Sequence, residues 1–402
     1  MSLRAMTPKQ VATSLIRRTE ALGISRFSNL GPFVSLDVRV VQAVRVTLAD
    51  GQVSATTGKG WNLWQALCGA LGEAFERYCA AHPPVPDVTH RDIAQAVSLA
   101  GWGHPVNFVP RDVFPAHELI SGRSFLLPAL EVYFPYHGPD RARTSVRPHT
   151  SGLASGSTLE EATLFGLLEV IERHTSSMFF SQFLHAPTGA LIHAGSIPHS
   201  PITSALEELT TQGYESFIFR IDALLPVYYV AILDTANLGP KFMVSGVAAH
   251  LDEYQALEGA FLEAMQAVVI AAQGAREDLS RHASSYRDQQ MGQRNPYYRI
   301  RSHLAHTNPT IAFPHATVAL NQSAAEVLPH LLTYLRGAGV QSVYRCDLSP
   351  PGWPLHAVKL IVPGMFDTHI NSSRCNLAAT TACPPHRIWR PLTAPGPRSL
   401  ST

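Results

Sequence analysis

Charged residues are scarce in this sequence, and neither sign dominates. They make up 15% of the 402 residues, against about 25% in an ordinary soluble protein. Because the formal net charge is only +1, no basic excess exists to neutralise phosphate groups. This balance excludes the usual electrostatic case for a nucleic-acid or anionic-membrane partner. Disorder is excluded as well, since it needs high net charge and low hydrophobicity, whereas 46% of these residues are hydrophobic.

Cysteines are few and show no recognisable spacing. No two of them form a C-x-x-C pair and their number is odd, which argues against a disulfide framework and against a zinc ribbon. The five are Cys68, Cys79, Cys346, Cys375 and Cys383. The 19 histidines likewise show no H-E-x-x-H or paired ligand spacing.

Targeting signals are also missing. The N-terminal residues contain no apolar region followed by a small-residue cleavage site. No uninterrupted apolar run reaches the about 18 residues that a transmembrane helix needs. With reduced, unpaired cysteines, this pattern predicts a cytoplasmic protein without a membrane segment.

Hydrophobic periodicity predicts helices interleaved with strands. The expected helices cover residues 7–22, 62–80, 159–180, 253–273 and 323–337. The expected strands cover residues 38–48, 215–221, 226–233, 242–249, 340–345 and 356–362. Residues 85–148 are rich in proline, glycine and short apolar runs, so we expect loops and short strands there. No composition break divides the chain. We therefore predict one α+β domain over residues 1–402, with a core of about 30–370 and a proline-rich tail at 371–402.

The most informative feature is a match of the chain to itself. Residues 58–77 (GKGWNLWQALCGALGEAFER) align at a constant offset with residues 154–173 (ASGSTLEEATLFGLLEVIER). Each copy reads as a small-residue turn that leads into a helix ending in E-x-x-E-R. A single duplication indicates internal pseudo-symmetry, not a solenoid, which needs three or more repeats.

Helical geometry gathers carboxylates on both copies. Residues three apart project from nearly the same helix face, and on the second helix three glutamates fall within about 80° of one another. The carboxylates are Glu73 and Glu76 on the first helix, and Glu161, Glu169 and Glu172 on the second. Their neighbours are largely apolar, so unpaired charges would be costly. Arg77 and Arg173 supply some positive charge, and oxygen-binding Mg²⁺ would supply the rest.

A simpler interpretation treats these glutamates as surface ion pairs on amphipathic helices. For one E-x-x-E-R copy that interpretation is preferred. Two copies in register, both behind glycines and on helices that are apolar nearly all round, favour the metal site. The GKG at 58–60 is no phosphate loop, because the G-x-x-x-x-G-K-[ST] spacing is absent. We expect it, and SGLASGS at 151–157, to form tight turns feeding helix N-termini, which can face an anion.

At these residues the chain resembles the YcaO family of ATP-dependent enzymes that activate peptide backbone amides. The first family motif is similar to residues 58–77, and the second, S-N-G-L-A-x-G-N followed by E-x-x-E-R, is similar to 151–173. The third, A-L-x-R-A-x-x-E-x-x-Q, is similar to 256–266 (ALEGAFLEAMQ). G-x-R-E-D-L follows at 274–279, and LIVPGMFD at 360–367 looks like the closing strand and turn. The resemblance covers most of the chain and keeps the family's motif order.

The resemblance implies a fold, cofactors and site residues. The fold would be YcaO-like, with antiparallel sheets stacked with helices around a central ATP/Mg²⁺ cavity. The implied Mg²⁺ ligands are Glu73, Glu76, Glu169 and Glu172. The implied ATP-binding residues are Lys9, Ser157, Glu161, Arg173, Glu263 and Gln266. No residue in the sequence is marked as a catalytic nucleophile or base, and Cys68 and Cys79 are expected to be core thiols.

The sequence departs from the family pattern at two site positions. Ser157 stands where the family has asparagine, and it reaches less far. Gly259 stands where the family has arginine, so one expected phosphate contact is missing. Arg276, Arg281 or an arginine of residues 286–303 could replace it. A nucleotide-poor homologue is the alternative.

The resemblance also implies a peptide-modifying reaction with a separate partner. The substrate would be a precursor peptide or protein, and the product an azoline, a thioamide or an amidine. The family's cyclodehydratases often end in a P-x-P-type terminus, but this proline-rich tail ends in Ser-Leu-Ser-Thr, which argues against azoline formation. Azoline and thioamide formation are both kept as expected reactions. We expect a separate TfuA-like or ubiquitin-activating-like partner, and a homodimer is a further assembly left open. The alternative is a non-catalytic accessory protein that assists ribosomal-protein methylthiolation.

Overall fold

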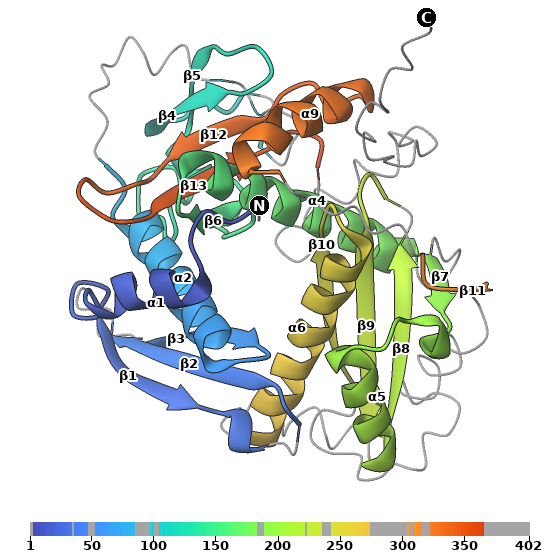
Figure 1. Cartoon of the computed structure of the whole chain (residues 1–402). Coiled ribbons are helices and arrows are strands. Elements are labelled where there is room, and N and C mark those ends of the chain that lie inside the picture. The colour runs from blue at the N-terminus through green and yellow to red at the C-terminus, as the bar shows by residue number, and fades with distance from the viewer. Residues whose placement is uncertain are drawn as a thin grey trace, which may run out of the picture.

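A computed structural model of the chain describes residues 3–33, 36–46, 53–84, 97, 99, 104–105, 107–182, 189–221, 223–234, 243–273, 304, 309–314 and 322–365. Within them, helices and strands form three sheets with helices packed against them (Figure 1). All strand pairs in these sheets are antiparallel except β11 (Thr310–Ile311) with β7 (Gly189–Ile192).

The N-terminal part forms a three-stranded sheet, in the order β1-β2-β3, with two helices. Its elements are α1 (Pro8–Ile16), β1 (Ile24–Asn29), η1 (Gly31–Phe33), β2 (Arg39–Val46), β3 (Val53–Gly60) and α2 (Leu63–Ala81). Thr7 caps α1, and Pro8 occupies the first turn. The prediction of a helix to residue 22 is wrong, because the chain turns after Ile16 and enters β1 through Gly23, whose φ is +70°.

The second sheet has the strand order β5-β4-β12-β13-β6. It is built from β4 (Val113–Glu118), β5 (Ser124–Pro128), η2 (Ala129–Glu131), β6 (Leu153–Gly156), α4 (Leu159–Gln182), α9 (Ala324–Gly337), β12 (Tyr344–Asp347) and β13 (His356–Ile361). The expected helices at 159–180 and 323–337 are confirmed. The strand expected at 340–345 begins only at Tyr344. The pairing of β12 with both of its neighbours, β4 and β13, starts at that residue.

The third sheet has the order β10-β9-β8-β7-β11. With β7 and β11 it comprises η3 (Ala194–Ser196), α5 (Pro201–Thr211), β8 (Tyr214–Ile221), β9 (Val227–Asp234), β10 (Met243–Ala249) and α6 (Glu253–Gln273). The helix expected at 253–273 is confirmed to the residue, whereas α5 was not predicted. Strand β9 is buried along its whole length, which explains why its sequence shows no alternation.

Three strand–helix units recur and close into a ring. They are β3 with α2 (unit 1), β6 with α4 (unit 2) and β10 with α6 (unit 3). Each helix packs on its own strand and also contacts the strand of another unit: α2 contacts β6, α4 contacts β10 and α6 contacts β3 (Figure 1). Units 1 and 2 are the two copies found in the sequence. Unit 3 was not recognised as a third copy, because its helix carries E-x-x-Q instead of E-x-x-E-R.

Glycines let the strands of the units lie directly on their helices. A Cβ atom at Gly58 would collide with the backbone of Ala66 on α2, and one at Gly60 would collide with Gln65. The prediction that GKG is a tight turn is therefore wrong: it ends strand β3, and the turn follows at residues 61–62. Asn62 then caps α2 by accepting a hydrogen bond from the Gln65 N–H. SGLASGS likewise contains strand β6.

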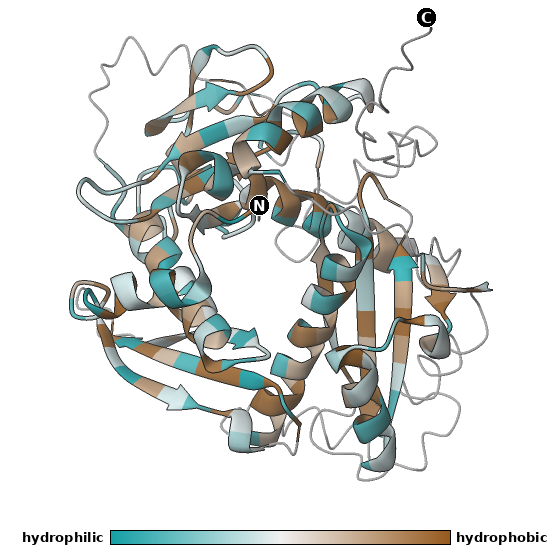
Figure 2. Ribbon diagram, in the orientation of Figure 1, coloured by the Kyte–Doolittle hydropathy of each residue, from teal (hydrophilic) through white to brown (hydrophobic). Residues whose placement is uncertain are grey.

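The hydrophobic core follows the three helices of the ring. Separate clusters surround α6 with β8–β10, α2 with β2 and β4, and α4 with α9 and β13. Outer helices such as α5 and α9 show hydrophilic turns beside hydrophobic ones (Figure 2). By length and composition α6 could cross a membrane, which no other helix in the described ranges could, and half of that stretch is buried within the protein.

Candidate active site

The carboxylates of α2 are held from both neighbouring strands. Glu73 accepts a hydrogen bond from the Thr57 N–H of β3 at 3.1 Å and one from Arg77 at 3.0 Å. Glu76 accepts one from the Ser155 hydroxyl of β6 at 2.7 Å. Burial raises the pKa of Glu76 to about 8, with nearby Glu169 and Glu73 adding to the effect and Ser155 opposing it. Both expected ligands of α2 thus lie in one polar cluster.

The carboxylates of α4 repeat this arrangement. Glu169 accepts a hydrogen bond from the Gly152 N–H at 3.1 Å and lies 3.6 Å from Arg173. Glu172 accepts one from the Ala249 N–H at the end of β10, at 3.4 Å, and lies 3.9 Å from Arg173. Burial raises the pKa of Glu172 well above its usual value, and the negative charge of Glu263 adds to this.

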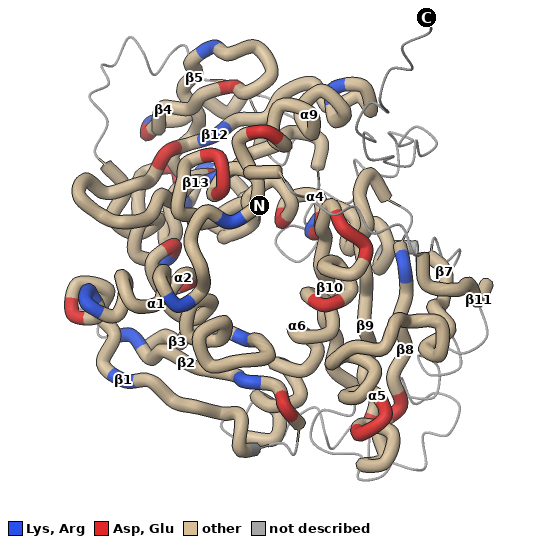
Figure 3. The backbone as a smooth tube through the Cα atoms, viewed as in Figure 1, with Lys and Arg blue, Asp and Glu red and all other residues tan. Residues whose placement is uncertain are grey.

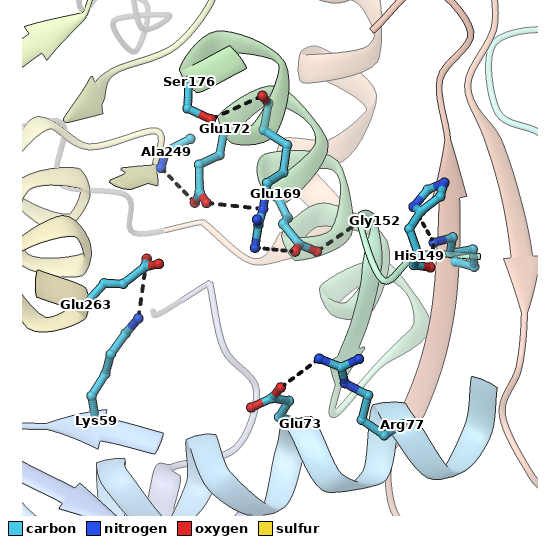
Figure 4. Close-up of polar contacts among 12 residues, drawn as sticks. Lys59, Glu73, Arg77, His149, Gly152, Glu169, Glu172, Ser176, Ala249 and Glu263 are labelled. Carbon is cyan, nitrogen blue, oxygen red and sulfur yellow. Dashed lines mark hydrogen bonds and ion pairs between the residues drawn. The ribbon is translucent and has the colours of Figure 1, made fainter. Parts of the chain in front are cut away.

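Unit 3 contributes the third set of side chains. Glu263 lies on α6, and its Oε2 atom is 3.5 Å from Nζ of Lys59 on β3. Gln266 lies on the next turn of α6 and is half-buried. Figure 4 shows the carboxylates from α2, α4 and α6 pointing into the space between these helices. The structure therefore brings five of the six expected carboxylates toward one region, although they come from residues far apart in the chain.

Glu161 is held by the N-terminal segment. It is buried at the start of α4, with 2% of its surface exposed. Arg4 Nη1 donates to one carboxylate oxygen at 3.3 Å, and the Ala5 N–H donates to the other at 3.1 Å. The Arg4 guanidinium also covers the ring of Phe165, 3.9 Å from its centroid. Arg4 was not predicted, because a single cation in a loop has no periodic signal.

Two expected ATP-binding residues stand apart from the ion pairs. Lys9 Nζ lies 5.3 Å from the ring centroid of Trp64, and among the described residues it makes no ion pair. The Ser157 hydroxyl is buried and has no hydrogen-bond partner within the described part of the chain. A buried polar atom without a partner is costly, so Ser157 is suited to receive a hydrogen bond from, or donate one to, a bound ligand.

The charge distribution fits Mg²⁺ bound together with phosphate. Acidic and basic segments lie beside one another on α2 and where α4 passes the centre (Figure 3). No group of three His, Cys, Asp or Glu side chains within the described ranges is close enough to hold an ion by itself. Mg²⁺ is usually held by one or two carboxylates plus substrate phosphates, with no cage made only of protein. Pairs such as Glu73 with Glu76 match that requirement.

The position of the missing arginine is closed by packing. A Cβ atom at Gly259 would lie 2.8 Å from the Cβ of Ala248 on β10, so α6 approaches the strand too closely for a longer side chain. The suggested replacements Arg276 and Arg281, and the arginines of residues 286–303, lie outside the described residues. Beside Glu263 of α6 the structure places Lys59, whereas Arg220 pairs with Glu253 at the start of the helix.

The described cysteines have the character of core thiols. Cys79 and Cys346 are buried and Cys68 is half-buried, and none of the three forms a disulfide. Burial raises the pKa of all three thiols, that of Cys346 to about 12. Since the thiolate is the nucleophile, these residues are poor candidates for covalent catalysis.

Sequence reasoning missed two site residues that the repeat could have identified. Ser155 holds Glu76, and Lys59 pairs with Glu263. The constant offset that aligns Glu73 with Glu169 also aligns Lys59 with Ser155. The paired strand positions were thus visible in the sequence, but the helices that they face were not.

Two proteins of similar sequence cover most of the chain. An uncharacterized protein of Methanothermobacter thermautotrophicus is 29% identical over 375 residues, which span 91% of this chain and 95% of the relative. An uncharacterized protein in the tfuA 3′ region of Rhizobium leguminosarum bv. trifolii is 22% identical over 382 residues, which span 90% of this chain and 88% of the relative.

Solved structures share the fold at lower identity. YcaO from Methanopyrus kandleri, bound with AMPPCP and Mg²⁺, has a TM-score of 0.70 at 21% identity and covers 92% of this chain and 94% of its own. A heterocyclase in complex with substrate and cofactor has a TM-score of 0.70 at 18% identity, covering 90% of this chain and 53% of its own. The E. coli microcin synthetase McbBCD complex has a TM-score of 0.62 at 16% identity, covering 85% of this chain and 88% of its own. The expected YcaO-like α+β fold is confirmed.

A sequence model of one family matches most of the chain. Its description is YcaO cyclodehydratase, ATP- and Mg²⁺-binding, and the match runs over residues 57–366. That description confirms ATP and Mg²⁺ as the expected cofactors. The matched range begins within β3 and includes the rest of unit 1 and all of units 2 and 3. The chain therefore belongs to the YcaO family.

Proposed function

We propose that this chain is an ATP-dependent enzyme that activates backbone amides of a ribosomally synthesised peptide or protein during peptide natural-product maturation. The observation that carries the proposal is the pairing of Glu73 and Glu76 with Glu169 and Glu172 across two helices. Burial raises the pKa values of Glu76 and Glu172, and neighbouring carboxylates add to the effect, so the charged forms of both side chains are costly until a cation binds beside them.

The residues present fit ATP and Mg²⁺. The two glutamate pairs offer the hard oxygen ligands that Mg²⁺ prefers. The unpartnered Ser157 hydroxyl, the Glu161 carboxylate and the Arg173 guanidinium offer hydrogen-bonding groups for a nucleotide. When bound, Mg²⁺ spreads the negative charge that develops on the phosphates.

In the proposed reaction a nucleophile adds to the carbonyl carbon of a backbone amide. The resulting oxyanion attacks the γ-phosphorus of ATP, and ADP leaves. The phosphorylated oxygen then departs as inorganic phosphate, so the amide oxygen is removed. A Cys, Ser or Thr side chain of the substrate gives an azoline, whereas external sulfide gives a thioamide and an amine gives an amidine.

The chain itself supplies positioning and charge. The Ser155 hydroxyl and the N–H groups of Gly152 and Ala249 hold the carboxylates in place before any ligand binds. Preorganised groups cost little reorganisation in the transition state. No described cysteine has a lowered thiol pKa, which supports a nucleophile that comes from the substrate or from solution.

Nucleotide binding tests the proposal first. Calorimetric titration of the full chain with ATP should show binding that requires Mg²⁺. Glu169→Gln and Glu76→Gln should each weaken Mg·ATP binding by at least about tenfold, because each removes a charged ligand. Glu207→Gln on the exposed face of α5 is the matched control and should bind like the unaltered chain.

The accessory alternative predicts a different result. A non-catalytic helper of ribosomal-protein methylthiolation would show no Mg²⁺-dependent ATP binding, and Glu169→Gln would change nothing. That outcome would overturn the enzyme proposal. Phosphate release that depends on a candidate peptide, with loss of one water from the peptide by mass spectrometry, would support azoline formation.

Thioamide formation is the second candidate, and one comparison favours it. A relative at 22% identity is named for its place in a tfuA 3′ region. We therefore propose a TfuA-like partner ahead of a ubiquitin-activating-like one, in the cytoplasm, where ATP is available and thiols are reduced. A reaction with the partner, a precursor peptide, ATP and sulfide should replace one peptide oxygen by sulfur. Azoline product under the same conditions would favour the first candidate.

A further inference from the structure

The three units of the ring each present one strand residue to a carboxylate of a neighbouring helix. Ser155 of β6 donates its hydroxyl to Glu76 of α2. Ala249 of β10 donates its backbone N–H to Glu172 of α4. Lys59 of β3 faces Glu263 of α6. Two of these contacts are neutral donors, so the β3–α6 contact differs in bringing a full positive charge.

The main chain at Lys59 is held rigidly. Gly58 and Gly60 on either side both press against α2, where a Cβ atom would collide. Because side chains alternate along a strand, Lys59 projects from the opposite face of β3, toward α6. Only its flexible side chain can adjust to a ligand.

The pairing with Glu263 leaves this cation available. The distance of 3.5 Å is long for a charge-assisted hydrogen bond. The side chains of Lys59 and Glu263 are 29% and 39% exposed, so the pair is partly hydrated and weak. An ammonium group has three donors, so one contact to Glu263 leaves others for an anion.

No other described side chain places a cation at this contact. Arg173 lies beside Glu169 and Glu172, and Arg4 holds Glu161. Position 259 of α6 is a glycine packed against Ala248. Lys59 also acts on Glu172: burial raises the pKa of that carboxyl, and the positive charge of Lys59 partly opposes the rise, so Lys59 affects carboxylates of two units.

We infer that Lys59 binds the polyphosphate of the nucleotide and supplies, from β3, the positive charge that α6 lacks. This role rests on the proposed function, since it requires that the site bind Mg·ATP. Lys59 would act as a point charge on phosphate oxygens. Its fixed main chain and its mobile ammonium suit a group that must accompany the phosphates as their charge changes.

The test compares nucleotides that differ in phosphate number. Lys59→Met keeps the length of the side chain and removes its charge. We expect it to weaken Mg·ATP binding by about 10- to 100-fold, as for loss of a hydrogen bond to a charged group, and to leave AMP binding within about twofold. Lys59→Arg should recover most of the ATP affinity. The matched control is Arg39→Met, which removes an exposed cation of β2 that pairs with Asp37 and should change neither affinity.

Each outcome decides a separate question. If the unaltered chain binds Mg·ATP and Lys59→Met binds it equally well, the inference is wrong and the proposed function stands. If the unaltered chain does not bind Mg·ATP, the proposed function itself fails. Equal weakening of ATP and AMP, or a lowered unfolding temperature that Lys59→Arg also shows, would assign Lys59 a structural role and overturn the inference.

Discussion

The Ser155 hydroxyl donates a hydrogen bond of 2.7 Å to the Glu76 carboxylate and so joins the two copies of the internal repeat. Ser155 lies in strand β6 of the second copy, and Glu76 lies on the helix of the first. An expected Mg²⁺ ligand is thus hydrogen-bonded to a residue that lies 79 positions away in the chain. The other units of the ring are also linked through a carboxylate, by the Ala249 N–H to Glu172 and by the ion pair of Lys59 with Glu263.

Removing this hydroxyl should loosen the ligand without unfolding the protein. In Ser155→Ala, Glu76 loses a donor that favours its charged form. We expect the Mg²⁺ concentration that half-saturates ATP binding to rise about 5- to 20-fold, in line with a hydrogen bond to a charged group. Ser204→Ala on the exposed side of α5 is the control. An unchanged Mg²⁺ requirement would show that Ser155 does not orient the ligand.

The raised pKa of Glu76 predicts proton release when Mg²⁺ binds. With a pKa of about 8, the carboxyl is largely protonated near neutral pH, and a metal ion requires the deprotonated form. The folded pKa lies above the usual value of 4.5, so the stability that the neutral carboxyl contributes is present at low pH and lost as pH rises through about 8. Mg·ATP affinity should therefore increase with pH up to about 8.

Calorimetry in two buffers of different ionisation enthalpy measures these protons. The glutamine in Glu76→Gln cannot titrate. Near pH 7 the unaltered chain should therefore release up to about one proton more per Mg·ATP bound than Glu76→Gln does. Protons released by ATP itself are the same for both proteins, so they cancel in this difference. Identical proton release from the two proteins would contradict the prediction.

His250 should make stability fall in acid. Its Nδ1 accepts a hydrogen bond from the Asp252 N–H at 3.1 Å, which needs the neutral ring. Burial, aided by Arg4, lowers its pKa from 6.5 to about 4. The unfolded chain therefore binds more protons in this range, so the contribution is present above pH 6.5 and lost as pH falls toward 4.

An asparagine at this position can accept the same hydrogen bond and does not titrate. The free energy of unfolding should therefore fall less between pH 6.5 and pH 4 in His250→Asn than in the unaltered chain, by at most about 3 kcal/mol. Urea unfolding at several pH values measures it, with His82→Asn at the exposed end of α2 as control. An unchanged pH dependence would rule out His250 as the source.

Gly259 should tolerate no long side chain while Ala248 is present. A Cβ atom there lies 2.8 Å from the Ala248 Cβ, so Gly259→Arg should lower the free energy of unfolding by about 1–3 kcal/mol, as overpacking does. Adding Ala248→Gly should recover part of this loss. Urea unfolding of Gly259→Arg, of Ala248→Gly and of the double variant tests this expectation. A fully stable Gly259→Arg protein would show that α6 can move away from β10.

The repeat shows how far local pattern reaches in this protein. The helix of Glu73 and Glu76 and that of Glu169 and Glu172 were predicted from periodicity and from the aligned copies, because helical spacing alone decides which residues share a face. The turn predicted at Gly58–Gly60 was wrong. A glycine that allows a strand to lie on a helix has the same sequence signal as a glycine in a turn.

The sequence by itself determined the family motifs, the helices that carry the carboxylates and the scarcity of charge around them. Only the tertiary structure decided which partner each carboxylate meets: Ser155 for Glu76, Lys59 for Glu263 and Arg4 for Glu161. The reason is physical. Residues one turn apart meet through local geometry, whereas these pairs meet because three strand–helix units close into a ring, and ring closure depends on packing between distant segments that no local pattern records.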